Sequence, residues 1–308
     1  MKVTLICTLL NEAANLAALL DSLGRQVRLP DEVVFCDAGS RDGTVEILRG
    51  FAARFPRPFR FIEEPGNRSQ GRNTAIRQAE HDYIACTDAG CVLDERWLER
   101  LVLPFERDPS VDVVSGFYAA RGETCFERCA AVVTLSTRGV TAETFLPSAR
   151  SIAFRKEAWH QAGGFPEHLD FAEDTQFALK LRKEGLRFAL ATDALVYWRP
   201  RSSPGQVFSQ LRTYALGNAQ AGILYTNYFR PHLRYSLWLA LTAAVFIHPG
   251  WLALWVPAVL PYWGKWAVAG WRECRDWRAL LLTPGIKLIA DAGQFAGFWS
   301  GVWRPKRT

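Results

Sequence analysis

A short apolar run that stops at a carboxylate is the feature that most constrains how this chain can fold. Tyr83-Ile84-Ala85-Cys86 leads to Asp88 and Gly90, and an amphipathic stretch from Glu95 to Phe105 follows, with Asp94 as a candidate N-cap. Such a run is typical of a strand that is buried on both faces of a parallel sheet. Ligands of open α/β sheets bind just beyond the carboxyl ends of the strands, so we expect Asp88 at a ligand site. The other common role of Asp after a strand is to cap a turn.

Strands and helices alternate at short spacing on both sides of this run. We expect strands over residues 3–10, 32–36, 59–62, 111–118 and 151–154, and helices over residues 15–23, 45–53, 70–79, 123–138, 156–162, 174–183 and 205–222. The alternation predicts an α/β fold with a Rossmann-like, mostly parallel sheet and helices on both faces.

Charge and cysteine content exclude some classes of function. The net charge is +6, but the arginines are scattered singly and no dense basic block is present, so we expect no nucleic-acid partner. Cys7, Cys36 and Cys86 lie inside predicted strands, which indicates buried thiols in a reducing compartment. Cys125 and Cys129 share one helix face without a second pair at metal-binding spacing, so the sequence argues against zinc.

Polar motifs follow the predicted strands in a specific order. They are Asn11-Glu12, the turn Asp37-Ala38-Gly39-Ser40-Arg41-Asp42-Gly43-Thr44, Gly71-Arg72-Asn73, Asp88, Gly163-Gly164-Phe165 and Glu173-Asp174. In this order and spacing, over roughly residues 1 to 220, the chain resembles the family 2 glycosyltransferases, which are GT-A-fold enzymes that use nucleotide-sugar donors. The resemblance therefore implies glycosyl transfer.

The resemblance also assigns roles to residues. It places Asn11, Glu12, Asp37, Arg72 and Asp88 at the nucleotide sugar, and a helix bearing Gln210 and Arg212 over the donor. Strand-end residues can meet the base and the ribose hydroxyls, and a guanidinium is a rigid donor fork. The alternatives are a capping role for Glu12, a surface position for Arg72 and simple packing for the helix.

The catalytic base that the resemblance implies is Asp174, supported by Glu173. Family members are mostly inverting, which implies one displacement at the anomeric carbon without a covalent enzyme intermediate. A carboxylate at a helix N-terminus is held ionised by the helix dipole, which suits a proton acceptor. An ordinary N-cap is the alternative role of Asp174.

Three family positions are altered, and they bear on the metal. Gly90 stands where the family has a second carboxylate, Ala38 where it often has Asp, and Trp198 where it commonly has His. A divalent cation, Mg²⁺ or Mn²⁺, then has Asp88 as its one carboxylate ligand. We expect weak metal dependence, with Arg199, Arg201 and Arg212 taking part of the charge neutralisation, although ordinary surface charge is the competing reading of these arginines. No organic cofactor is expected.

The C-terminal part differs from the rest, which suggests a catalytic domain over residues 1–229 and a helical region over 230–308. Residues 235–264 contain no charged side chain, His248-Pro249-Gly250 interrupts them, and basic residues flank both ends. We expect membrane-associated helices on the cytoplasmic face of the membrane, as a hairpin dipping into the bilayer or as two short spans, with an interfacial helix at 280–303. The alternative is a buried helical subdomain or a dimer contact.

The sequence thus predicts a glycosyltransferase that moves a sugar from a nucleotide sugar to a lipid-linked or cell-envelope glycan acceptor. One alternative is a membrane-associated nucleotide-sugar-binding protein with a decayed site, motivated by Gly90, Ala38 and Trp198. A nucleotide-dependent oxidoreductase is disfavoured because Thr8-Leu9-Leu10-Asn11 stands where a glycine-rich dinucleotide motif belongs.

Overall fold

The computed structural model describes residues 1–135, 140–223 and 225–303. It divides into two compact units. The first contains residues 1–119 and 138–198, and the second contains residues 120–137 and 199–308.

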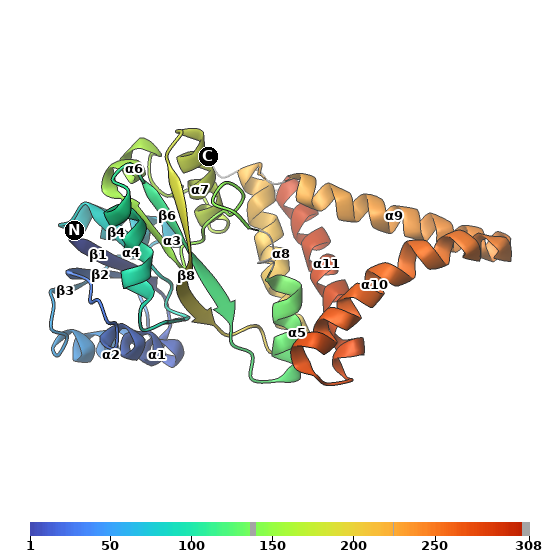
Figure 1. The fold of residues 1–308 in the computed structure, drawn as a ribbon, viewed down its shortest axis with the longest axis horizontal. Helices are drawn as coiled ribbons and strands as arrows, with labels where there is room; N and C mark the ends of the chain where they lie inside the picture. Colours follow the sequence, from blue (N-terminus) through green and yellow to red (C-terminus); the bar gives the residue numbers. More distant parts are fainter. Residues whose placement is uncertain (136–139, 224, 304–308) are drawn as a thin grey trace. The chain divides into compact units, whose positions relative to one another are not determined.

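The first unit is built on an eight-stranded sheet with the order β3-β2-β1-β4-β7-β6-β8-β5 (Figure 1). Its strands are β1 (Val3–Leu9), β2 (Glu32–Asp37), β3 (Phe59–Glu63), β4 (Tyr83–Cys86), β5 (Cys91–Leu93), β6 (Val113–Ala120), β7 (Ile152–Arg155) and β8 (Phe188–Trp198). The pairs β1–β2, β1–β4 and β2–β3 are parallel. The pairs β4–β7, β6–β7 and β5–β8 are antiparallel.

The expectation of a mostly parallel sheet is therefore wrong, because the sheet is mixed. The four N-terminal strands alternate with helices that carry the chain back, as parallel pairing requires. β7 instead enters the sheet between β4 and β6 and runs against both of them. The local apolar pattern of a strand does not encode the direction of its distant partner.

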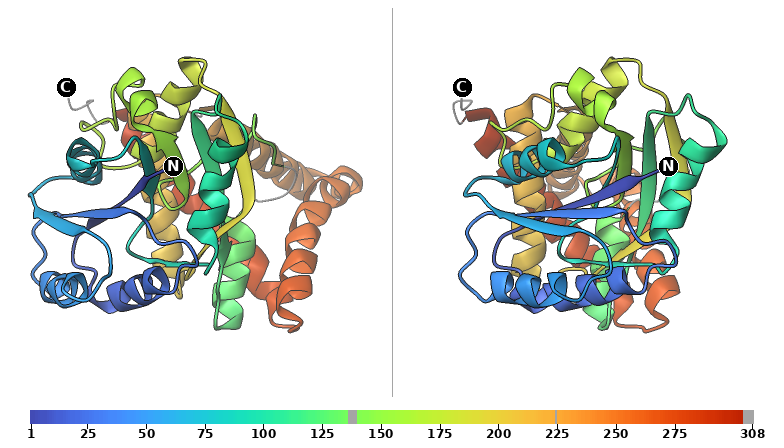
Figure 2. Two further views of the ribbon diagram at one scale, coloured as in Figure 1. Left: turned by 60° about the vertical axis from the view of Figure 1, so that its left-hand side comes forward. Right: turned by 90° about the vertical axis from the view of Figure 1, so that its left-hand side faces the viewer.

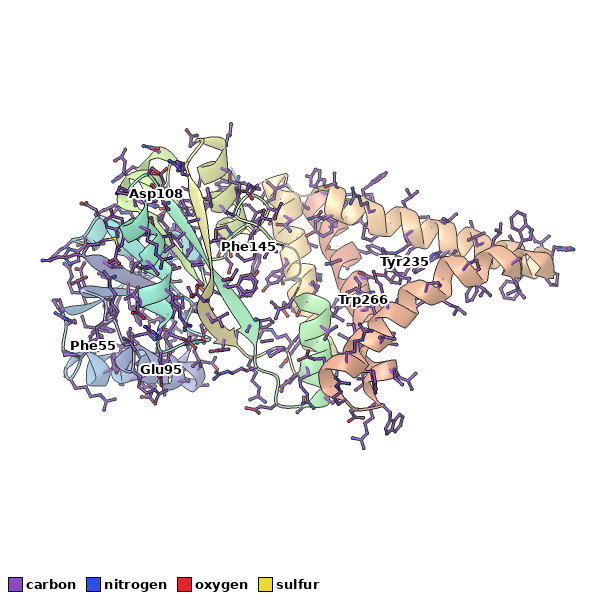
Figure 3. The ribbon with its side chains drawn as sticks, viewed as in Figure 1. Phe55, Glu95, Asp108, Phe145, Tyr235 and Trp266 are labelled. Atoms are coloured by element: carbon purple, nitrogen blue, oxygen red, sulfur yellow. The ribbon has the colours of Figure 1, made fainter. Side chains whose placement is uncertain are left out.

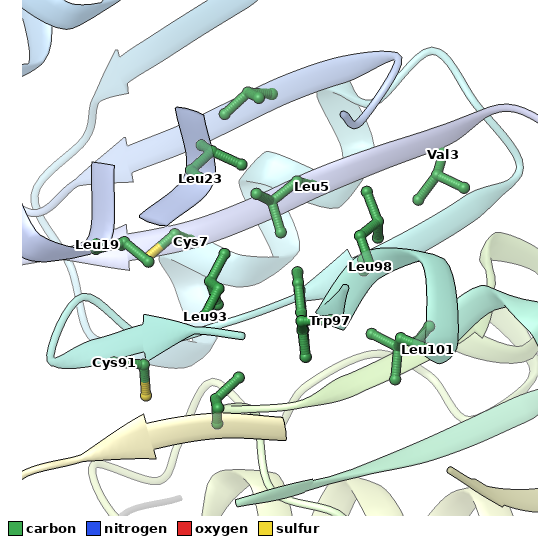
Figure 4. Packing of buried hydrophobic residues seen from close by; sticks show 14 of the residues in the cluster. Val3, Leu5, Cys7, Leu19, Leu23, Cys91, Leu93, Trp97, Leu98 and Leu101 are labelled. Carbon is green, nitrogen blue, oxygen red and sulfur yellow. The ribbon is translucent and has the colours of Figure 1, made fainter. Parts of the chain in front are cut away.

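Helices cover both faces of this sheet and enclose two apolar cores. They are α1 (Ala13–Gly24), α2 (Thr44–Ala52), α3 (Arg68–Gln78), α4 (Trp97–Arg107), α6 (Lys156–Gln161) and α7 (Glu173–Lys183). Figure 2 shows α1 and α2 on one side of the parallel strands and α3 on the other. One core joins α1, α2 and α4 to the sheet and includes the fully buried Trp97 (Figure 4). The second core joins α3, α6 and α7 to the opposite face.

The stretch from Tyr83 to Cys91 is divided between two strands. β4 ends at Cys86, a turn carries Asp88 and Gly90, and β5 then leaves in a new direction to pair with β8. The following helix has Arg96 as its N-cap and not Asp94, whose carbonyl oxygen accepts a hydrogen bond from the Trp97 N–H at 2.8 Å. Asp88 consequently lies half-buried on the turn between two strands of the sheet.

The second unit is entirely helical. It contains α5 (Cys125–Thr134), α8 (Pro204–Ala221), α9 (Tyr225–Ile247), the short 3₁₀ turn η1 (Pro249–Trp251), α10 (Leu252–Cys274) and α11 (Ala279–Trp303). Its limits differ from the predicted division into residues 1–229 and 230–308, because α5 and α8 group with the C-terminal helices. The glycines Gly293, Gly297 and Gly301 of α11 bring its backbone against α8, and this close packing joins the two helices.

α9 and α10 form a helical hairpin that closes at η1 (Figure 1). The break falls at the predicted His248-Pro249-Gly250. Aromatic side chains of both helices contact one another towards the base of the hairpin, and Tyr235 and Trp266 of this set are labelled in Figure 3. The side chains nearest the turn are exposed, with Phe246 at 87% and Ile247 at 84%.

None of the helices within the described ranges combines the length and the apolarity that crossing a membrane requires. The expectation of two short spans is therefore wrong, because neither α9 nor α10 is long and apolar enough to cross a membrane. The predicted interfacial helix corresponds to α11, which buries Ile286 and Ala290 within the helical unit. For α11 the structure agrees with the alternative of a buried helical subdomain.

Gly297→Ala tests the close approach of α8 and α11. A Cβ atom at Gly297 would lie 2.0 Å from the carbonyl oxygen of Arg212, which is backbone and cannot rotate away. We expect the substitution to lower the free energy of unfolding by about 3 kcal/mol, as measured by urea denaturation.

The matched control is Gly285→Ala on the same helix. A Cβ atom there meets no heavy atom within 4 Å, so alanine should stabilise the helix by about 0.5–1 kcal/mol. Equal effects of the two substitutions would contradict the packing described here.

Candidate active site

Hydrogen bonds join the loops after β1 and β2 into one polar rim. Asn11 adopts a left-handed conformation (φ 53°), its N–H donates to Ser40 Oγ at 2.8 Å, and its Oδ1 accepts from the Arg41 N–H at 2.9 Å. The Glu12 N–H donates to Thr44 Oγ1 at 2.9 Å. Two motifs that are separate in the sequence are thus one structural unit at the carboxyl ends of parallel strands.

Within this rim the carboxylates of Asp37 and Asp42 maintain the loop conformation. Asp37 is buried, and its Oδ2 accepts from the N–H groups of Gly39 and Ser40 at 3.0 and 2.8 Å. Asp42 Oδ1 accepts from the Thr44 N–H at 3.2 Å and so holds the turn that precedes α2, whose N-cap is Gly43. The Glu12 carboxylate remains partly exposed and accepts from an amide N–H of the exposed Asn15.

Arg72 is the centre of the candidate site. It is 2% exposed, its Nη1 donates to Glu173 Oε1 at 2.7 Å, and its Nη2 donates to Asp88 Oδ1 at 3.0 Å. The guanidinium carbon also lies 5.4 Å from the ring centre of Phe165. One side chain of α3 therefore ties the turn after β4 to the first residue of α7. Arg72 thus positions the two carboxylates, and its predicted contact with the nucleotide stays a prediction.

The charges of this group determine its protonation. Burial raises the pKa of Asp88, but the charges of Arg72, Arg150 and Arg68 more than offset this and leave the pKa below its usual value. Burial, together with the neighbouring Asp174, raises the pKa of Glu173 in spite of Arg72. Asp88 is thus held ionised, with its side chain 35% exposed at the surface of the site.

Asp174 is placed differently from its neighbour Glu173. It is the second residue of α7, after Ala172 in a left-handed conformation (φ 60°). Asp174 Oδ1 accepts from the Thr175 N–H at 2.7 Å, and Oδ2 accepts one long hydrogen bond from the Ala149 N–H at 3.4 Å. Glu173 is buried against Arg72, whereas Asp174 is half-buried.

Asn73, adjacent to Arg72, connects α3 to the glycine-rich loop. Its Oδ1 accepts from the Phe165 N–H at 2.9 Å and from Trp159 Nε1 at 3.0 Å, and its Nδ2 donates to the Phe165 carbonyl oxygen at 2.9 Å. Gly164 has a φ of 74°, and a Cβ atom there would lie 3.1 Å from Asn73 Oδ1. Two further sequence motifs therefore meet beside the Arg72 group.

Trp198, the residue at the expected His position, is the last residue of β8 and pairs with Cys91, close to the Asp88 turn. The Arg150 guanidinium lies over the Trp198 ring at 5.3 Å. No local sequence pattern indicated Arg150, because its proximity to Asp88 arises from the β4–β7 pairing.

The residues of this site do not form the set of metal ligands that is common in the family. At the three positions where the family holds its metal ion, this chain has Asp88, Gly90 and Trp198, so only Asp88 offers a carboxylate. One oxygen of Asp88 already accepts a hydrogen bond from Arg72. Space is not the obstacle, because a Cβ atom at Gly90 meets no heavy atom within 4 Å. Asp88 could supply one ligand to a hard cation.

The remaining predicted residues belong to the second unit. Arg199 forms ion pairs with Glu123 and with the buried Glu127, both at 2.8 Å. Arg201 is exposed, and Gln210 donates to the Tyr214 hydroxyl at 3.1 Å. The Arg212 backbone packs against α11. The role of Gln210 and of these three arginines at the donor remains a prediction.

The mixed sheet and the polar groups at its strand ends define a GT-A-type glycosyltransferase fold. The mannosyltransferase PcManGT from Pyrobaculum calidifontis, solved with GDP-Man and Mn²⁺, shares this fold with a TM-score of 0.61 and 23% identity, over 97% of this chain and 87% of its own. TarS of S. aureus, residues 1–349, in complex with UDP, gives a TM-score of 0.52 and 21% identity over 98% of this chain and 90% of its own.

Family models identify the chain itself. Residues 83–272 match the model "Glycosyl transferase family group 2", and residues 4–133 match "Glycosyl transferase family 2". The chain belongs to the family 2 glycosyltransferases, as the motifs predicted, and the oxidoreductase alternative is thereby excluded.

Two curated relatives extend over most of the chain. The glycosyltransferase AglE of Haloferax volcanii is 26% identical over 243 residues, which is 77% of this chain and 79% of the relative. The succinoglycan biosynthesis protein ExoA of Rhizobium meliloti is 27% identical over 311 aligned residues, which is 94% of this chain and 92% of the relative.

Proposed function

We propose that this glycosyltransferase moves a sugar from a nucleoside-diphosphate sugar to a hydroxyl group of a growing cell-envelope glycan. The observation that carries the proposal is the cluster around Arg72, where Asp88, Glu173 and Asp174 gather beyond the strand ends. The GDP-Man and UDP bound by two structural neighbours support the donor class. The name of the relative ExoA supports a polysaccharide product.

The reaction we propose is a single displacement with inversion. The acceptor hydroxyl transfers its proton to Asp174 Oδ2 while its oxygen forms a bond to the anomeric carbon. The bond from that carbon to the diphosphate oxygen breaks, and the nucleoside diphosphate leaves with the electron pair. Glu173 and Arg72 act as positioning residues, since their ion pair fixes the first turn of α7 beside the donor.

If Asp174 is the catalytic base, its substitution should lower turnover and leave donor binding nearly unchanged. Asp174→Asn keeps the hydrogen bond to Thr175 but removes the proton acceptor, so transfer should fall by about 100-fold or more. Donor binding, measured as the thermal shift with GDP, UDP and their sugar conjugates, should change little.

The exposed Asp193→Asn serves as the matched control and should transfer like the wild type. Wild-type turnover of Asp174→Asn would remove Asp174 from the catalytic role. A wild-type protein that binds donors but neither transfers nor hydrolyses them would instead establish the alternative of a decayed site.

We also propose that transfer depends only weakly on a metal ion. Asp88 supplies one carboxylate, and guanidinium groups meet the remaining diphosphate charge: Arg150 beside Asp88, together with the sequence-predicted Arg199 and Arg201. The Mn²⁺ of the neighbour PcManGT shows that a divalent ion can accompany this fold. The positions altered here give such an ion fewer ligands.

Chelation tests this proposal directly. We expect activity to survive excess EDTA in large part, whereas Gly90→Asp should gain activity on addition of Mn²⁺ because a second carboxylate then faces the ion. Gly90→Ala is the control, as it adds the Cβ atom without the ligand and the position is open. Complete loss of wild-type activity in EDTA with full recovery on Mn²⁺ addition would overturn the proposal.

The acceptor, we propose, is presented at the cytoplasmic face of a membrane, and the hairpin of α9 and α10 contacts that surface. Residues 235–264 carry no charged side chain, and Arg234 and Lys265 flank this stretch on either side. The exposed apolar side chains of the hairpin include Leu239, Phe246, Ile247 and Leu254. Burying such a surface among acyl chains is favourable, and the flanking cations would meet anionic headgroups.

Phe246→Glu combined with Ile247→Glu should abolish co-sedimentation with anionic phospholipid vesicles, because two charges then enter the apolar layer. Val27→Glu, at an exposed apolar side chain of the first unit, should leave sedimentation unchanged. Point substitutions are preferable to deletion from Pro231, which would also remove α11 from the helical unit. Absence of sedimentation by the wild type would refute membrane contact.

A further inference from the structure

Three cysteines meet inside the helical unit. Cys125 and Cys129 occupy successive turns of α5, and Cys274 is the last residue of α10. Their sulfur atoms all lie within 4.8 Å of one another, and the pair Cys129–Cys274 is separated by 3.5 Å. The spacing along the chain gave no sign of this, because Cys274 lies 145 positions from Cys129.

The chain geometry brings Cys274 to α5 for a clear reason. Arg275 adopts a left-handed conformation (φ 54°), which ends α10 and turns the chain towards α11. The Cys274 thiol then lies 3.6 Å from the carbonyl oxygen of Cys125. Thr283 of α11, which is fully buried, lies beside Cys129, so a third helix borders the cysteine cluster. The three sulfurs therefore come from two helices, and a third helix supports them.

The spacing of the sulfurs suits one small, soft cation. Zinc–thiolate bonds of about 2.3 Å place the sulfurs of a trigonal or tetrahedral site about 3.8–4.0 Å apart. The Cys129–Cys274 separation is 3.5 Å and the other separations do not exceed 4.8 Å, so side-chain rotations that change these distances by up to about 1 Å would complete the site. Thiolates prefer Zn²⁺ or Cu⁺ over Mg²⁺ or Mn²⁺.

We propose that Cys125, Cys129 and Cys274 bind a thiophilic cation, Zn²⁺ or Cu⁺, which clips the N-terminal half of α5 to the C-terminal end of α10. Three S–H bonds lose their protons to solvent as three sulfur–metal bonds form, and a water molecule can complete a tetrahedral zinc site on the side of the half-exposed Cys125. The surrounding side chains Ala130, Val207 and Ala279 are apolar and buried, which shields the sulfurs from competing ligands.

The clip would have a structural role within the helical unit. α5 also carries Glu127, the fully buried partner of Arg199, between the two cysteines. Fixing α5 would therefore fix this ion pair as well. Burial raises the pKa of the Cys129 and Cys274 thiols, so without a metal they remain protonated and neutral, which the apolar surroundings tolerate.

The test uses the full chain, purified with a phosphine reductant and titrated with Cd²⁺ as a spectroscopic probe. We expect one Cd²⁺ per chain, a sulfur-to-cadmium charge-transfer band in the ultraviolet and a higher melting temperature. Cys125→Ser and Cys274→Ser should lose the band, whereas Cys7→Ser, at an equally buried thiol in β1, should retain it. Competition of Zn²⁺ against Cu⁺, read as metal content per chain, then identifies the preferred cation.

Cys125→Ser is the variant least prone to misfold because this side chain is half-exposed, and circular dichroism checks that it folds. A band that persists in Cys125→Ser and Cys274→Ser would place the cation elsewhere and overturn the proposal. Absence of Cd²⁺ binding by the reduced wild type, combined with loss of two thiols on treatment with diamide, would show that Cys129 and Cys274 are instead a redox pair.

Discussion

The buried guanidinium of Arg72 is the interaction on which the catalytic half of this structure depends. A charge at 2% exposure is stable only where its partners are present, and removal of one partner of a buried pair typically costs about 3–5 kcal/mol. Here the partners are Asp88 and Glu173, which reach Arg72 from the turn after β4 and from α7. The same contact thus stabilises the fold and arranges the carboxylates of the site.

This arrangement also separates the roles of two adjacent carboxylates. Glu173 is engaged in the ion pair with Arg72, whereas Asp174, one residue further along the first turn of α7, accepts only a long hydrogen bond at Oδ2 from the described residues, from the Ala149 N–H. The left-handed Ala172 before them sets the start of the helix and hence the direction of both side chains. A strained backbone residue at such a position is common in functional sites, where it is part of the positioning.

The helical unit buries charged side chains within an otherwise apolar segment. Lys287 and Asp291 interrupt the last apolar stretch, and in α11 they stand four residues apart and form an ion pair. Tyr235 of α9 donates a further hydrogen bond to Asp291 at 2.8 Å. Lys287 and Asp291 are buried, but each has a charged or hydrogen-bonding partner, so their burial is tolerated. α11 can therefore lie inside the unit and pack its glycines against α8.

The sequence by itself determined the family and most of the strands and helices along the chain, because these depend on local periodicity and on motifs of short range. It did not predict the short β5, and the roles it gives to the site residues stay predictions. The tertiary structure alone decided the mixed direction of the sheet, the engagement of Arg72 by Asp88 and Glu173, the proximity of Arg150 to Asp88 and the meeting of Cys274 with α5. Each of these joins residues that are distant in the chain. Their contacts follow from strand pairing and helix packing, and no local pattern records which distant partner a side chain will meet.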